Sequence, residues 1–563
     1  MRNTRRSFAC FAGAALLSSS LGCGAGPQLG ANSALLPLEG VCPEAATDGS
    51  MDFSSEVSKL RLQVDGPSME APMSVEGPVG QITLEDIPVG DNLQVTLYGL
   101  DANGAVSWRG IRQDVSIAAD QNVGIDVLLS KVADLSCPRS PLSNQRSFHS
   151  ATALPDGRVL LIGGADDSLD ASGEGAGARR LTATATTEIY DPSLGTFSPA
   201  GPLNVARMMH TATLLPDGRV AVVGGVSEVV TLGENAGGTF PIKPKTTPTS
   251  VIEVWDPESG AFSTIGEDPW GPRMFHAATL TDAGELLVTG GIPGLASPHD
   301  LSNALRGSTR CDVATLSCQR GPDMVRARVG HSMTLLANGN ILIWGGSVET
   351  ATDTSGAGYK PEMWRDSGFV GLNPIGFSNS PVLNPFFASA VEYTNNRVVA
   401  GGGLTRLVNG TFELSEISDE QIQRGPVFIF DATGGADGQI SAGPYGGASG
   451  NVLDPLRLAE PRFLGTVVAV TGNRAVFSGG FSSLSLTPSS SLDVFSESAL
   501  DVEPIYASGQ PRLLREARGA QTATSLGNGT ILISGGEIGS STGHRPCASA
   551  EIFTDPVEPG APK

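Results

Sequence analysis

Apolar and polar residues alternate in short runs from Phe53 to Val132. Alternation with a period of two residues is typical of half-buried antiparallel strands. The alternating apolar positions are Leu60, Leu62 and Val64, then Ile82 and Leu84, then Leu93, Val95 and Leu97, then Val115 and Ile117, and last Val123, Ile125 and Val127. Residues 101–104, Asp-Ala-Asn-Gly, have the composition of a hairpin turn. This pattern predicts a small β-sandwich over residues 53–132, without giving its strand order.

The rest of the chain repeats one frame seven times. In the first repeat the opening residue is at position 146 and a glycine pair begins 17 residues later, at position 163, and every other repeat keeps this interval. The openers are Arg146, Arg207, Arg273, Arg328, Asn384, Arg462 and Arg518. The pairs are Gly163 and Gly164, Gly224 and Gly225, Gly290 and Gly291, Gly345 and Gly346, Gly401 and Gly402, Gly479 and Gly480, and Gly535 and Gly536. A constant interval between variable loops predicts a conserved hairpin.

Each repeat is predicted to hold four strands. Turns such as Asp156-Gly157 join the first two strands, and the glycine pair ends the second where a side chain would collide with neighbouring backbone. A second hairpin follows most pairs, as at 188–197 and 253–262, where an aromatic-Asp-Pro turn recurs. The fifth repeat is degraded at 384–387, and the outer hairpin of the fourth is unclear within 347–383.

The opener Arg-x-x-His, the glycine pair and the aromatic-Asp-Pro turn together resemble the Kelch family of the galactose-oxidase-like propeller superfamily. The resemblance covers about three quarters of the chain and implies an all-β protein. It predicts a seven-bladed Kelch-type β-propeller over residues 133–556, and the domain before it resembles an immunoglobulin-like or prealbumin-like sandwich. The last repeat lacks its outermost strand, so residues 133–142 are expected to supply it and close the ring.

The N-terminus has the features of an export signal. Residues 1–23 begin with a basic region that includes Arg5 and Arg6, as in twin-arginine signals, and continue with an apolar stretch too short to span a bilayer. Residues 20–23 resemble a bacterial lipobox, which makes Cys23 a candidate for lipidation, although Ser20 stands where that motif has leucine. Cleavage and free secretion is the alternative. Residues 24–52 are expected to be a flexible linker and 557–563 a C-terminal tail.

Export to an oxidising compartment favours disulfides. Cys311 and Cys318 would face each other across a hairpin, and Cys137 on the closing strand is expected to pair with Cys547. Cys42 is then left without an expected partner.

Acidic residues outnumber basic ones by 58 to 36, which gives a net charge of -22. Such a charge repels the phosphate backbone, so no nucleic-acid partner is expected. It also suits a soluble monomer whose only link to a membrane is a lipid anchor.

The repeated histidines are candidates for a metal site or for structural contacts between blades. They are His149, His210, His276 and His331, which occupy one repeat position in four consecutive blades. Because the repeat itself copies them, we favour the structural interpretation, and no cofactor is expected. The opener arginines are likewise expected to pair with a carboxylate or carbonyl of the neighbouring blade.

Long insertions follow three of the glycine pairs, at 165–186, 226–250 and 403–424, and all would emerge on one face of the ring. This favours a non-catalytic binding or scaffold protein of the cell surface or periplasm that recognises a protein or glycan there. The alternative is a secreted oxidoreductase or carbohydrate-active enzyme of galactose-oxidase-like architecture. Against it, the sandwich precedes the propeller, tyrosine is scarce, and no His-Glu-x-x-His motif is present.

Overall fold

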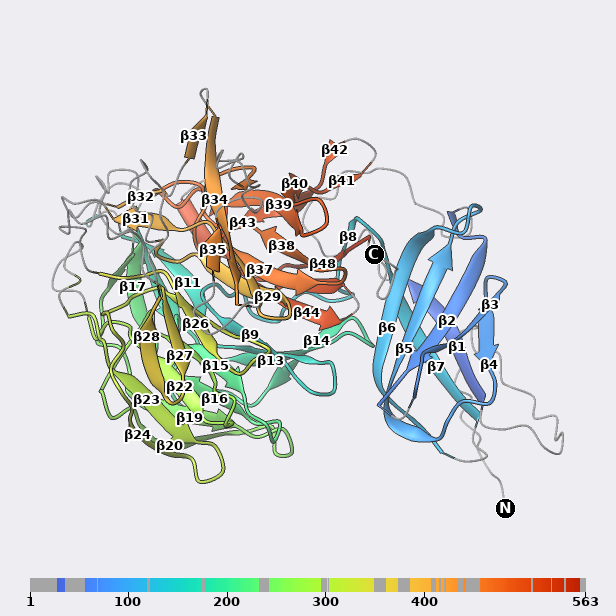
Figure 1. Cartoon of the computed structure of the whole chain (residues 1–563), viewed down its shortest axis with the longest axis horizontal. Helices are drawn as coiled ribbons and strands as arrows, with labels where there is room; N and C mark the ends of the chain where they lie inside the picture. The colour runs from blue at the N-terminus through green and yellow to red at the C-terminus, as the bar shows by residue number, and fades with distance from the viewer. Residues whose placement is uncertain are drawn as a thin grey trace, which may run out of the picture.

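The computed structural model describes residues 28–35 and 56–556, except for 68, 119–121, 172, 174–177, 232–241, 295–300, 302, 349–360, 373–384, 407–411, 415–416, 420–421, 433–438, 442–455, 508–509, 528 and 541–542. The named elements of this part are all β-strands, in mostly antiparallel sheets, which confirms an all-β protein (Figure 1). Within it, no helix has the length and apolar character to cross a membrane. The predicted signal, Cys23 and the C-terminal tail lie outside the described residues.

Seven strands form the first domain, the blue body of Figure 1. Their order is β3 (Met73–Gly77), β2 (Lys59–Asp65), β5 (Gly90–Leu100), β6 (Val106–Ile117), β7 (Asn122–Lys131), β1 (Gln28–Leu35) and β4 (Gln81–Leu84). β6 and β7 are joined by only two residue pairs, Trp108 with Lys131 and Arg109 with Ser130. The alternating apolar positions of these strands form one core, because successive side chains point to opposite faces of a strand.

Strand β1 corrects the expected linker at 24–52. It runs parallel to β7, from Gln28 opposite Asn122 to Leu35 opposite Leu129, and pairs antiparallel with β4. Leu29 is fully buried in the core of the domain. The segment lacks a sustained alternating pattern, and its neighbours in the sheet, which lie far away in sequence, hold it as a strand.

Seven antiparallel sheets follow, here numbered first to seventh in chain order. The first sheet has β9 (Ser150–Ala153), β10 (Val159–Ile162), β13 (Thr187–Asp191) and β14 (Thr196–Ala200). The second has β15 (Thr211–Leu214), β16 (Val220–Val223), β19 (Val251–Trp255) and β20 (Phe262–Glu267). The third has β21 (Ala277–Leu280), β22 (Leu286–Thr289), β23 (Ser308–Asp312) and β24 (Ser317–Arg320). The fourth has β25 (Ser332–Leu335), β26 (Ile341–Trp344), β27 (Glu362–Arg365) and β28 (Gly368–Gly371), so its outer hairpin lies at 362–371.

The last three sheets carry additional strands. The fifth has β29 (Ser389–Thr394), β30 (Arg397–Gly401), β34 (Ile422–Asp431) and β33 (Ile417–Asp419), with β35 (Gln439–Ser441) and β36 (Arg457–Leu458) paired to β34. The sixth has β37 (Thr466–Val470), β38 (Arg474–Ser478), β39 (Ser489–Ser496) and β40 (Asp501–Pro504), with β43 (Leu513–Arg518) paired to β39. The seventh has β44 (Thr522–Gly527), β45 (Thr530–Ser534), β48 (Ala550–Thr554) and β8 (Leu135–Ser136).

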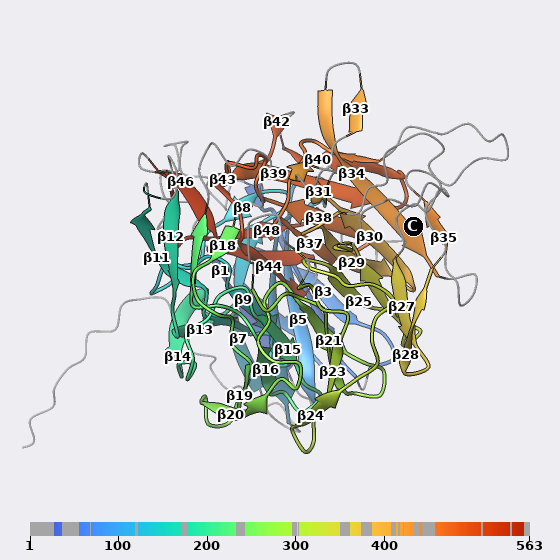
Figure 2. The same cartoon turned by 90° about the vertical axis from the view of Figure 1, so that its left-hand side faces the viewer.

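The sheets follow one another in a ring, seen in Figure 2 with the first domain behind it. The first strand of each sheet contacts the first strand of the next, and β44 contacts β9. The second glycine of each pair donates its N–H to the carbonyl of the next opener position. These bonds are Gly164 to Arg207 (2.9 Å), Gly225 to Arg273 (2.9 Å), Gly291 to Arg328 (2.8 Å), Gly346 to Pro385 (3.0 Å), Gly403 to Arg462 (2.8 Å), Gly480 to Arg518 (2.9 Å) and Gly536 to Arg146 (2.8 Å). The last bond joins the seventh sheet to the first.

These bonds correct the frame of the fifth repeat by one residue. The opener is Pro385 rather than Asn384, and the glycines of the pair are Gly402 and Gly403, with φ of 77° and 109°. Gly401 instead ends strand β30. Because three glycines follow one another here, the sequence offers two registers, and only the ring bonds choose between them.

The closing strand forms as predicted. β8 is the fourth strand of the seventh sheet, with Ser136 opposite Ile552 on β48. The N–H of Ala133 extends this pairing to the Thr554 carbonyl (2.8 Å). A strand from before the first repeat therefore covers the edge of the last sheet.

The ring has two different ends. At the end where openers and glycine pairs lie, called the loop end, the insertions form strands of their own: β11 (Ala165–Asp170), β12 (Arg179–Ala183), β17 (Glu228–Thr231) and β18 (Ile242–Pro244) in one sheet, β31 (Leu404–Arg406) with β32 (Phe412–Leu414), and β46 (Glu537–Ser540) with β47 (Gly543–Pro546). The opposite end carries the Asp-Gly turns and is called the turn end.

The first domain packs against the turn end. Gln113 donates to the Leu526 carbonyl (3.2 Å), and the Ser130 hydroxyl lies 2.5 Å from that of Thr554. Arg109 is fully buried and donates to the Asp555 carbonyl (2.6 Å). The loop end therefore lies away from the first domain.

Candidate functional site

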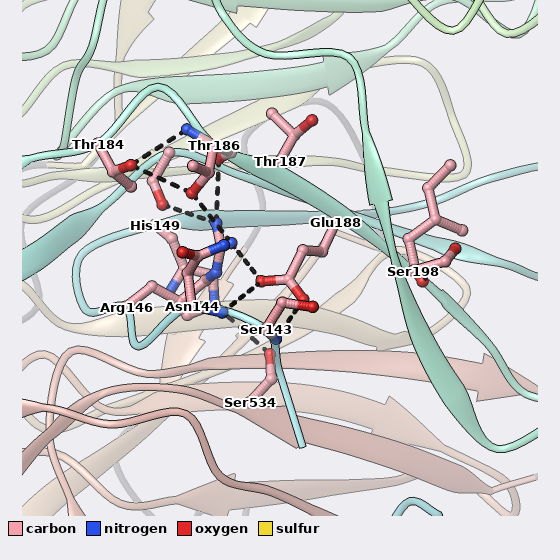
Figure 3. Close-up of polar contacts among 12 residues, drawn as sticks. Ser143, Asn144, Arg146, His149, Thr184, Thr186, Thr187, Glu188, Ser198 and Ser534 are labelled. Carbon is pink, nitrogen blue, oxygen red and sulfur yellow. Dashed lines mark hydrogen bonds and ion pairs between the residues drawn. The ribbon is translucent and has the colours of Figure 1, made fainter. Parts of the chain in front are cut away.

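The opener arginines anchor each sheet at the loop end. Arg146 is fully buried, donates from Nη2 to Glu188 on β13 (2.6 Å) and from Nη1 to the Gly163 carbonyl (2.9 Å) (Figure 3). Glu188 also accepts the N–H of Ser143 (2.6 Å). The same buried pair recurs as Arg207 with Glu253, Arg328 with Glu362, Arg462 with Asp493 and Arg518 with Glu551. For these five arginines the expected partner in the neighbouring blade is wrong, because the carboxylate lies in the same sheet, and the opener's own carbonyl makes the contact between sheets.

Two sheets depart from this arrangement. In the third, the prediction is confirmed, since Arg273 pairs with Asp268, which follows β20 of the second sheet; Thr309 stands where most other sheets have a carboxylate. In the fifth, Pro385 replaces the arginine and Phe428, buried against Trp344, replaces the carboxylate.

The four repeated histidines link neighbouring sheets. Each Nε2 lies within hydrogen-bond distance of a hydroxyl of the preceding sheet: His149 and Thr522 (2.9 Å), His210 and Ser150 (2.8 Å), His276 and Thr211 (2.9 Å), and His331 and Thr289 (2.8 Å). Burial, and after it the charge of the adjacent opener arginine, lowers the pKa of His210 and of His331 to about 3. The imidazoles are therefore neutral near pH 7 and hold the sheets together as hydrogen-bonding groups.

A belt of backbone lies next to the histidines, two residues after each opener. Its seven members all have positive φ, between 51° and 61°: Phe148, Met209, Phe275, Gly330, Phe387, Leu464 and Ala520. Most of them donate an N–H to the preceding member, as Met209 does to Phe148 (3.0 Å) and, across the closing point, Phe148 does to Ala520 (3.0 Å). A left-handed conformation is costly for side chains such as Phe and Leu, and the hydrogen bonds of the belt offset that cost.

The belt and the histidines line an axial cavity of about 270 Å³ at the loop end. Phe275 and Phe387 meet edge to face across Gly330, with ring centroids 5.0 Å apart. The walls combine apolar side chains with the four imidazoles, Ser389 and Gln521. Among the described residues, no group of three or more His, Cys, Asp or Glu side chains is placed to hold a metal ion.

The hydrogen-bonded pair of Ser147 and Glu537 at the loop end was not predicted from the sequence. Glu537 is buried two residues after Gly535, and its Oε1 accepts a short hydrogen bond from Ser147 of the first sheet. Burial raises the pKa of Glu537 to about 7. The sequence did contain a signal for Glu537, because it is a carboxylate at a repeat position that is apolar in most other sheets.

The cysteines confirm one predicted disulfide and refute the other. Cys311 and Cys318 face each other on β23 and β24 and are joined, with Cα atoms 4.0 Å apart. Cys547, however, is a buried free thiol, and Cys137 is disulfide-bonded to a partner outside the described residues. The register of β8 against β48 places Cys137 opposite Glu551, about 13 Å along the strand from Cys547, which is beyond the reach of a disulfide.

Comparison with known proteins gives one partial similarity. No family model matches the chain. Two galactose oxidases of Gibberella zeae, one from strain PH-1, are each 32% identical to it over 137 residues. The match covers 22% of this chain and 19% of each oxidase, so the chain spans about a fifth of the length of these curated relatives. The similarity and the all-strand structure fit a fold of the galactose-oxidase-like type.

Proposed function

We propose that residues 133–556 form a seven-bladed Kelch-type β-propeller preceded by an immunoglobulin-like sandwich. We further propose that the protein binds a protein or glycan at its loop end, without catalysis. The ring of bonds from glycine to opener and the four-stranded order of most sheets support the fold. The partial similarity to galactose oxidases is consistent with it.

The observation that carries the function is the different occupancy of the two ends. The first domain covers part of the turn end, whereas the insertions at the loop end are built into strands around the axial cavity. Ordered loops on a rigid ring are a common setting for recognition. The repeated histidines already bind hydroxyls of neighbouring sheets, which supports a structural role for them.

The proposed location is the bacterial cell surface or periplasm, after export by the signal at residues 1–23. Lipidation of Cys23 would provide the only membrane attachment, and the protein would otherwise be a monomer. The charge of -22 argues against nucleic acid as a partner.

The second candidate, a secreted oxidoreductase or carbohydrate-active enzyme, is favoured by the partial similarity to galactose oxidases. Elemental analysis of the purified protein separates the two candidates. Stoichiometric copper that is lost in H276A, together with peroxide release from sugars, would replace the binding proposal with this one.

A matched pair of variants tests the binding surface on a glycan array and with purified envelope proteins. Leu169 on β11 is 50% exposed at the loop end, and Leu194 is 56% exposed in the turn between β13 and β14 at the turn end. L169D is expected to weaken binding at least tenfold, while L194D binds like the wild type. Equal effects of the two substitutions would refute a binding site at the loop end.

A further inference from the structure

The junction between the first and seventh sheets differs chemically from the others. At the other junctions, the residue after the glycine pair of one sheet lies near the residue after the opener of the next sheet, and most of these residues belong to one buried apolar cluster. After the pairs stand Ala165, Val226, Ile292, Leu404 and Phe481, and after the openers Met208, Met274, Val329, Phe386 and Phe463. At this junction the contact is between Ser147 and Glu537. The junction between the first and seventh sheets is called the closing junction, and it comprises these two residues with strands β11, β12, β46 and β47.

Glu537 is buried, so whether its carboxyl group is protonated or ionised affects the stability of the closing junction. Its side chain is 1% exposed, and its Oε2 has no hydrogen-bond partner among the described residues. Its backbone is held by Gly519, which donates to and accepts from it. A buried ionised oxygen without a partner is costly, whereas the neutral acid loses little by burial.

The hairpin of β11 and β12 contacts the hairpin of β46 and β47, whose first residue is Glu537. The Ser168 hydroxyl on β11 donates to the His544 carbonyl on β47 (2.8 Å). Arg179 on β12 binds Ser168 through Nε (3.0 Å) and through Nη2, and its positive charge favours the ionised form of Glu537. Ionisation of Glu537 would therefore compete for the arginine that holds these strands.

The other charged or titratable groups around Glu537 are His544, Arg146, Arg518 and Asp166. Burial lowers the pKa of His544, so its imidazole is neutral at pH 7. Arg146 and Arg518, the openers on either side, are committed to buried carboxylates. Asp166 on β11 lies near Arg146, and its backbone carbonyl accepts from Gln145.

We propose that the closing junction is a proton-controlled clamp on the loop end. With Glu537 protonated, the junction buries no uncompensated charge, and it and the two hairpins stay closed. With Glu537 ionised, the cost of the buried charge on the unpartnered Oε2 outweighs the stronger hydrogen bond from Ser147, so the junction loosens and strands β11, β12, β46 and β47 open more often. Its effect on partner binding rests on the proposed function, but the clamp itself does not.

Amide hydrogen exchange of the full protein at pH 5.5 and 8.5, corrected for the intrinsic exchange rate, tests the clamp. Protection of β46, β47 and β11 is expected to fall at least tenfold at the higher pH, while β16 and β22 stay unchanged. E537Q is neutral at both values and should remove the difference. Unchanged protection in the wild type, or a pH dependence that survives in E537Q, would overturn the proposal.

Two further variants keep the test independent of folding defects. E285Q changes a carboxylate that pairs with Arg310 on the third sheet and should retain the pH dependence of the wild type. S147A removes the hydrogen bond that favours the ionised form of Glu537, so the midpoint of the transition should move to higher pH. A midpoint that stays or falls in S147A would contradict the proposed contact.

Discussion

The second and fifth sheets are repeats of the same frame, but they carry different residues at three equivalent positions, charged or polar in the second and apolar in the fifth. In the second sheet Arg207 and Glu253 form a fully buried ion pair, and His210 binds the hydroxyl of Ser150. In the fifth, the same three positions carry Pro385, Phe428 and Ala388. Both sheets nevertheless make the same backbone bond to the preceding one, from Gly164 to Arg207 and from Gly346 to Pro385.

The two sheets show which repeat features occur in every sheet and which can be replaced. The backbone bond and the positive φ of the glycine pair are present in all seven sheets. The ion pair can be replaced as a set, because an arginine without its carboxylate would leave a buried charge unpaired. Trp344 packs against Phe428 at the junction where the imidazole and the ion pair are missing.

The largest expected loss of stability comes from lowering the pH. Burial lowers the pKa of His210 and His331 to about 3, so the unfolded chain binds protons more readily than the folded one below pH 6.5. Stability is then lost as the pH falls, by up to about 1.4 kcal/mol per pH unit for each histidine. Amide exchange at pH 4 should open the first four sheets before the fifth and sixth, which have Ala388 and Gly465 instead. Uniform opening would contradict this.

E253A should cost about 3–5 kcal/mol of unfolding free energy, because it leaves Arg207 charged and buried without its carboxylate. Denaturant unfolding measures the loss. The control is E258A, an exposed residue in the turn that follows β19, which should stay within about 0.5 kcal/mol of the wild type. Similar costs for the two variants would show that the buried pair does not hold the second sheet.

Alanine at the two candidate glycines tests the corrected frame of the fifth repeat. G402A forces a left-handed φ of 77° on alanine and places its Cβ 2.5 Å from the Arg462 carbonyl oxygen, so it should cost about 2–4 kcal/mol. G401A meets side chains rather than backbone, the edge of the Phe477 ring at 2.9 Å and a methyl group of Val427 at 3.1 Å, and should cost about 1 kcal/mol. Thermal unfolding of both variants decides the register, and a larger loss in G401A would restore the frame that begins at Asn384.

The smallest effect is expected when the second sheet is made to resemble the fifth. R207M/E253L removes both charges and keeps apolar bulk, so stability should lie within about 1–2 kcal/mol of the wild type. Denaturant unfolding beside E253A provides the comparison. If the double variant lost as much as E253A, the ion pair would be needed as such and the fifth sheet would require another explanation.

The sequence predicted the elements whose signal is local. The constant interval from opener to glycine pair predicted the inner hairpins, alternation predicted most strands of the first domain, and the facing positions of Cys311 and Cys318 predicted their disulfide. Each of these depends on residues close together in the chain, where turn chemistry and strand period act directly.

The tertiary structure decided what depends on distant segments. It recruited Gln28–Leu35 into the first domain, chose Gly402 and Gly403 over the overlapping pair, and separated Cys137 from Cys547 by the register of β8. It also brought Ser147 to Glu537, 390 residues apart in the chain, because closing a ring joins its first and last sheets. Sequence periodicity determines which strands form, but only packing determines which buried groups meet.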